Sequence, residues 1–70
     1  MRRELVSSTN LRSIGYDPET KTLEVEFVNG HIYEYRGVPP AAYEGLDQAR
    51  SKGSHFNRHI KDRYAFHRVS

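Results

Sequence analysis

The residues best suited to bind a charged partner lie in the last third of this 70-residue chain. Residues 50–70 contain six lysines and arginines against one acid, whereas residues 1–49 contain five against eight acids. Clustered cations of this kind indicate an anionic partner and are typical of phosphate-binding surfaces. We predict a phosphate-binding patch; the alternative is a solvated basic helix that keeps a small protein soluble. The six cations are Arg50, Lys52, Arg58, Lys61, Arg63 and Arg68.

Two tyrosines, Tyr33 and Tyr35, offer a second kind of contact. Aromatic residues on an exposed sheet face stack on bases in several RNA-binding modules. Buried tyrosines instead lie beneath covering helices, with their hydroxyl groups reaching the rim of the core. The choice between these interpretations depends on the register of the sheet.

A histidine pair and the serines are the remaining candidates for chemistry. His55 and His59 are four residues apart, so a helix would place both on one flank, where two histidines can share a metal ion. No third ligand accompanies them, and the residues between them lack the glutamate of a zinc-protease motif. We expect an exposed pair and no metal. The chain has no cysteine nucleophile, and its serines have no placed base, so we predict a non-catalytic protein without a cofactor.

Length and composition limit the architecture. A chain of 70 residues forms one domain with a small core, and its net stability is about a few kcal/mol. The absence of cysteine rules out disulfides and suits a reducing cytoplasm. The apolar stretch Leu5-Val6 is too short for a signal peptide or a membrane span. We expect a cytoplasmic protein that does not enter a membrane.

The segment 23–35 organises the predicted fold as two strands joined at Asn29-Gly30, which is a strong hairpin signal. A two-residue loop would divide the apolar side chains between the two faces. A three-residue loop over 28–30, with Gly30 in the left-handed region, unites them on one face, and we predict this register. It favours the buried interpretation of the tyrosines. The united residues are Leu23, Val25, Phe27, Tyr33 and Tyr35.

This register has one unfavourable consequence. It places Glu24 opposite Glu34, and like charges directly opposed destabilise a sheet. We expect Arg12 on a neighbouring strand to offset the repulsion.

The segments before the hairpin are less patterned. Residues 1–10 are polar and lack a period, so we expect a partly disordered tail. A first strand follows over 11–16, with a bulge at Gly15, and a turn over 17–20 leads into the hairpin. Three consecutive antiparallel strands form a meander.

Two helices follow the strands. Prolines end the sheet, and Pro40 favours a helix that runs to about Arg50. A break over 51–54 follows, with Gly53 as the left-handed residue and a serine as cap.

A second helix is predicted because Phe56, Ile60 and Tyr64 recur at four-residue steps, which buries one face. We expect residues 65–70 to form a tail. The predicted fold class is α+β: a three-stranded antiparallel meander followed by two short helices packed on one face.

The apolar, glycine and tyrosine positions of these strands, turns and helices together resemble those of the KTSC domain family, over about residues 7–69. The resemblance implies a single KTSC-like domain over residues 11–70. That domain is also found at the C-terminus of some lysyl-tRNA synthetases and has no established activity; the attachment suggests RNA binding. Proline often follows the last tyrosine in this family, whereas this chain has Ala65. The pattern is carried by Ile14-Gly15-Tyr16-Asp17, Leu23, Val25, Phe27, Asn29-Gly30, Tyr33, Tyr35, Val38-Pro39, Tyr43, Leu46, Ala49, Ser51, Gly53, Phe56-Asn57, Ile60 and Tyr64.

The sequence thus favours a small binding module that contacts RNA through its basic C-terminal third, with Tyr33 and Tyr35 as further candidates. The alternative is a protein-interaction domain without a nucleic-acid role, which would use the helical face or the face of the sheet that carries three glutamates and Ile32. We expect a monomer or a weak dimer in either case. The three glutamates are Glu24, Glu26 and Glu34.

Overall fold

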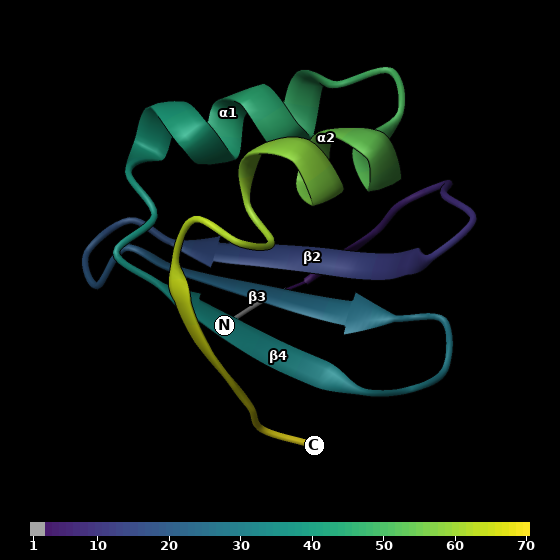
Figure 1. Ribbon diagram of the computed structural model, residues 1–70, viewed down its shortest axis with the longest axis horizontal. Coiled ribbons are helices and arrows are strands. Elements are labelled where there is room, and N and C mark those ends of the chain that lie inside the picture. Colours follow the sequence, from purple (N-terminus) through teal and green to yellow (C-terminus); the bar gives the residue numbers. More distant parts are fainter. Residues whose placement is uncertain (1–2) are drawn as a thin grey trace.

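The computed structural model describes residues 3–70 and shows a five-stranded antiparallel sheet with two helices on one face (Figure 1). The strands lie side by side in chain order, from β1 to β5. The α+β class is confirmed. The elements are β1 (Glu4–Leu5), β2 (Leu11–Asp17), β3 (Thr22–Phe27), β4 (Ile32–Arg36), α1 (Pro40–Gln48), α2 (Lys52–His59) and β5 (Ala65–Arg68).

The prediction of a three-stranded meander was wrong, because the sheet gains one strand at each edge. The region expected to be an N-terminal tail supplies β1, where Glu4 pairs with Ile14. The expected C-terminal tail supplies β5, where Arg68 pairs with Tyr33; Figure 1 shows it running beside β4. Both strands are short and exposed. Backbone hydrogen bonds to their neighbours hold such strands, so their side chains need not alternate in a recognisable pattern.

The predicted hairpin register is confirmed. Val25 pairs with Tyr33, and the Phe27 amide donates to the His31 carbonyl at 2.9 Å. Gly30 has a φ of +91°, and its amide donates to the Phe27 carbonyl at 2.9 Å. The three-residue loop therefore gathers the apolar side chains of both strands beneath the helices.

Replacing Gly30 with valine should lower the free energy of unfolding by about 1–3 kcal/mol, because a β-branched residue strongly resists this positive φ. Nothing lies within 4 Å of the position that a Cβ atom would take, so the loss would reflect backbone strain alone. Thermal melts followed by circular dichroism measure it. Gly30→Asn is the matched control, because asparagine tolerates the left-handed region. A Gly30→Val melt that coincides with the parent's would contradict the turn.

Glu24 does face Glu34, but Arg12 does not offset the repulsion. Arg3, which precedes β1, forms an ion pair with Glu24 instead. Arg36 and His67 lie 3.8 and 3.5 Å from Glu34. The reason is local: Arg12 sits between Leu11 and Ser13, where the β2–β3 register shifts.

The same register shift corrects the predicted bulge. The irregularity lies near Arg12, whereas Gly15 pairs regularly with Glu24. Gly15 is buried.

The two helices begin close to their predicted positions. α1 starts at Pro40, as expected, and ends at Gln48, two residues before the predicted end. Ser51 caps α2 by accepting a hydrogen bond from the Ser54 amide at 3.3 Å. Gly53 was predicted to be left-handed, but it is helical and buried. A Cβ atom there would collide with the Asn10 side chain, so any larger residue at position 53 would force Asn10 in the loop before β2 to move.

The core lies between the helices and the sheet. Its members are all less than 4% exposed, and they include Phe56 and Ile60 from the predicted apolar stripe. Tyr64, the third member of that stripe, is half-buried beyond the end of α2. Figure 1 shows the helices above β2, while β4 and β5 extend away from them. The buried core consists of Leu11, Ile14, Leu23, Val25, Tyr35, Val38, Leu46, Phe56 and Ile60.

Candidate nucleic-acid interface

An aromatic groove lies where β4 and β5 extend beyond the helices. It has a volume of about 340 Å³ and opens between α2 with its following turn and the β3–β4 hairpin with β5. Aromatic rings in contact with one another line the groove from the β3–β4 hairpin to the edge strand β5. Its aromatic residues are Phe27, Tyr33, Tyr35, Phe56 and Phe66.

The rings hold one another at edge-on and tilted angles. Phe27 meets Tyr33 at a centroid distance of 5.5 Å and an interplanar angle of 87°. Phe66 of β5 lies 5.8 Å from Tyr33 and 5.2 Å from Tyr35. Phe66 is nevertheless 53% exposed, so one side of this cluster faces solvent. This exposed ring is continuous with the other rings of the groove, and contiguous exposed apolar surface can mark a binding site.

The structure separates the two predicted tyrosines. Tyr35 is only 3% exposed and belongs to the core, which agrees with the buried interpretation. Burial raises the pKa of Tyr35 to about 12, with smaller contributions from Tyr33 and Asp62. Tyr33 is half-buried and lines the groove, so it remains able to contact a ligand.

The raised pKa of Tyr35 predicts a loss of stability at alkaline pH. Because the folded-state pKa of about 12 exceeds the ordinary value of 10.0, the stabilising effect of the neutral phenol is complete below pH 10. It is lost as the pH rises toward 12. Urea unfolding at several alkaline pH values should show this decline, and Tyr35→Phe should reduce it. An equally steep decline in Tyr35→Phe would assign the effect to other groups.

Polar side chains border the groove on its helical side. Asn57 of α2 and Lys61 and Asp62 of the following turn line it, and all three are exposed. Asn10 contributes an amide from the loop before β2, held by a hydrogen bond from the Ser8 hydroxyl to its Oδ1 at 3.0 Å. The groove therefore combines ring faces with amides, a carboxylate and a cation.

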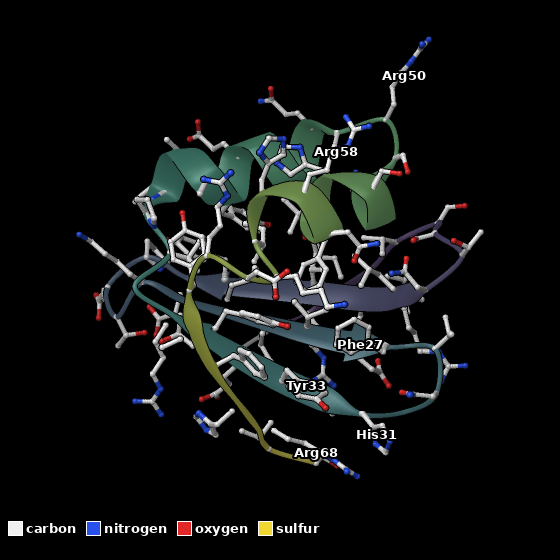
Figure 2. The ribbon with its side chains drawn as sticks, viewed as in Figure 1. Phe27, His31, Tyr33, Arg50, Arg58 and Arg68 are labelled. Atoms are coloured by element: carbon white, nitrogen blue, oxygen red, sulfur yellow. The ribbon has the colours of Figure 1, made fainter. Side chains whose placement is uncertain are left out.

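Arg68 brings a second cation to the face of the sheet that carries the groove. It is the cross-strand partner of Tyr33, and such partners point to the same face. Its Nε donates to the Ser70 carbonyl at 3.0 Å. Figure 2 shows Arg68 near Tyr33, with Phe27 above and His31 at the end of the hairpin.

The other four predicted cations lie away from the groove. Arg50 and Lys52 border a hollow with Ser7, Ser8 and Thr9, where Lys52 Nζ donates to the Asp47 carbonyl at 2.8 Å. Figure 2 places Arg50 and Arg58 on the helical side of the molecule, far from Arg68. The six cations are thus distributed over several surfaces, and their role in binding stays a prediction.

Arg63 borders a third hollow with the histidine pair. The rings of His55 and His59 lie 4.5 Å apart. His55 is half-buried rather than exposed as predicted, because its ring packs against Gly45 of α1. Burial, and then His59, lower the pKa of His55. Within residues 3–70, no group of three or more potential ligands is placed to hold a metal ion.

Several groove residues were not nominated from the sequence. Phe66 lies in the segment that was expected to be a C-terminal tail. Nothing in the sequence around Asn57 marked it as a ligand contact. The alternation of Phe66 and Arg68 was the available signal, since it places both on one face of a strand. That signal covers only two residues and has meaning only once β5 is known to pair with β4.

Comparison with known proteins agrees with this architecture. The KTSC domain family matches residues 7–64. The chain belongs to the KTSC domain family. A crystal structure of a KTSC domain protein from Yersinia pestis superposes with a TM-score of 0.93 at 38% identity, covering 99% of this chain and 97% of that one.

KTSC domain sequences similar to this one occur in two settings. An uncharacterized protein of Stutzerimonas stutzeri is 47% identical over 64 residues, which cover 91% of this chain and 90% of that protein. A lysine–tRNA ligase of Nostoc punctiforme is 45% identical over 60 residues, which cover 86% of this chain but only 11% of the ligase. Neither helix in the part of this chain that the structure describes is long and apolar enough to cross a membrane.

Proposed function

We propose that this KTSC domain is a small non-catalytic RNA-binding module and that the aromatic groove is its contact surface. The observation that carries the proposal is the solvent-facing aromatic cluster of Tyr33 and Phe66 with Lys61 and Arg68 beside it. Aromatic rings supply stacking surfaces for bases, and nearby cations attract the phosphates that follow them.

Charge supports this assignment. Within residues 3–70, the ion pairs involve Glu24 and Glu34 on the opposite face of the sheet. None of the six cations of the last third forms an ion pair with an Asp or Glu side chain in that part of the chain. Lys52 and Arg68 donate to main-chain oxygens, which leaves their positive charge uncompensated by an acidic side chain. The relation to a region of lysine–tRNA ligases, enzymes whose name includes a transfer RNA, points to the same class of partner.

The experiment is a titration of fluorescently labelled mixed-sequence RNA at two salt concentrations. Removing Lys61 and Arg68 together should weaken binding and flatten the slope of log affinity against log salt by about 1.4, at about 0.7 for each single-strand phosphate contact. The matched control removes Arg50 and Arg58, two exposed cations on the helical side.

The outcomes separate the surfaces. If the salt slope flattens in the Lys61 and Arg68 variant but equals the parent's in the Arg50 and Arg58 control, the result supports the groove as the RNA contact surface. Equal flattening in both variants would show that RNA contacts the cations of the whole C-terminal third and not the groove alone. A parent protein that binds RNA no more tightly than about 10⁻⁴ M at physiological salt would refute the function itself.

One observation favours a protein partner as the second candidate. β5 is an edge strand with the exposed apolar residue Phe66, at 53%, and Val69, at 45%, follows directly after it; such edges can pair with an added strand. The glutamate face is less suitable than expected, because Glu24 and Glu34 have ion-pair partners and Glu26 accepts from the Ser13 hydroxyl at 2.8 Å. Absence of saturable RNA binding in the titration, together with a protein partner recovered by pull-down, would support this alternative.

A further inference from the structure

We infer that the aromatic groove accepts an unpaired nucleobase, stacked on Phe66, so that the module binds single-stranded rather than duplex RNA. This inference rests on the proposed function and specifies the form of RNA that the site takes. It follows from the shape of the groove, from the position of Phe66 and from the groups on the facing wall.

The shape of the groove suits one small planar group. Its volume of about 340 Å³ lies at the lower end of the range for small-ligand sites, about 300–1,000 Å³. The groove has two walls, with α2 and its following turn facing the hairpin and β5. A duplex keeps its bases stacked inside the helix and presents backbone to the protein, so only an unpaired base can enter between such walls.

Phe66 provides the stacking surface. Its ring is tilted 31° from Tyr35 and 54° from Tyr33, so these neighbours support it without covering its exposed side. β5 fixes its direction, because Phe66 is the cross-strand partner of buried Tyr35. A half-exposed ring held in one orientation binds a base without first losing much conformational freedom.

The facing wall supplies groups that complement a base and its phosphate. The amides of Asn10 and Asn57 can both donate and accept, as the edges of bases require. The Asp62 carboxylate accepts hydrogen bonds from exocyclic amino groups. Lys61 stands on the same wall, and Arg68 lies two residues after Phe66 on the same face of β5, so cations border the path of the bound RNA strand on both sides.

The test uses a fluorescein-labelled single-stranded RNA of about ten nucleotides, within the usual site sizes for such modules, and the same strand annealed to its complement. The parent should bind the single strand more tightly than the duplex. Phe66→Ala and Phe66→Leu should weaken single-strand binding by about 5–150-fold, as expected for the loss of one base stack. Phe66→Tyr keeps the ring and should restore most of the affinity that Phe66→Leu loses. Val69→Ala changes a neighbouring exposed apolar residue outside the groove and should bind like the parent.

The readouts distinguish two kinds of failure. A duplex bound as tightly as the single strand, or Phe66→Leu that is folded and binds like the parent, overturns the inference while leaving RNA binding intact. A parent that binds neither form refutes the proposed function, and the inference with it. Tyrosine fluorescence gives a second readout, since the chain has five tyrosines and no tryptophan. A stacked base beside Tyr33 should quench it, and unchanged emission at saturating single strand counts against the site.

Discussion

Replacing Phe56 with alanine is expected to lower the free energy of unfolding by about 3–5 kcal/mol, which is comparable to the whole stability of so small a domain. Phe56 is 1% exposed and makes edge-to-face contacts with Phe27 and Tyr35, at centroid distances of 5.6 and 5.2 Å. It joins α2 to the hairpin. Its removal would leave a cavity that these rings cannot fill without leaving their own positions.

Urea unfolding followed by circular dichroism measures this loss. Phe66→Ala is the matched control, because it removes the same side chain from a half-exposed site on the edge strand. The control should cost far less stability, since little of the ring is withdrawn from water. Equal losses in the two variants would show that β5 is as much a part of the cooperative core as α2.

Tyr35→Ala is expected to have a similarly large effect, about 3–5 kcal/mol, because Tyr35 is 3% exposed at the centre of the aromatic network. Tyr35→Phe keeps the ring and serves as control. It should stay within about 1 kcal/mol of the parent, since Tyr35 lines the groove and the substitution removes only the hydroxyl group.

Comparing the losses of stability and of RNA binding in Tyr35→Ala and Tyr33→Ala shows which tyrosine stabilises the fold and which contacts the ligand. Tyr33 is half-buried at the groove, so its removal should cost less stability and affect RNA binding more. A Tyr35→Ala variant that melts with the parent would contradict its place in the core. The Phe56→Ala, Tyr35→Ala double variant should lose less than the sum of the single losses, because the two rings contact each other.

The alternation of apolar residues determined the hairpin, its three-residue loop and the face that it buries. These features are local: the loop requires a residue that accepts positive φ, and Gly30 provides it. One register alone unites Val25 with Tyr33. The start of α1 at Pro40 and the burial of Phe56 and Ile60 follow from equally local rules of helix initiation and period.

Only the tertiary structure decided the edges of the sheet and the groove. β1 and β5 are held by backbone pairing with distant strands, and two to four exposed residues carry too short a pattern to predict that pairing. Once β5 lies beside β4, Phe66 and Arg68 join Tyr33 on one face, and Lys61 faces them across the groove. The sequence showed that cations gather in the last third. Their division between the groove and the helical side depends on where the chain turns after α2, which no local pattern encodes.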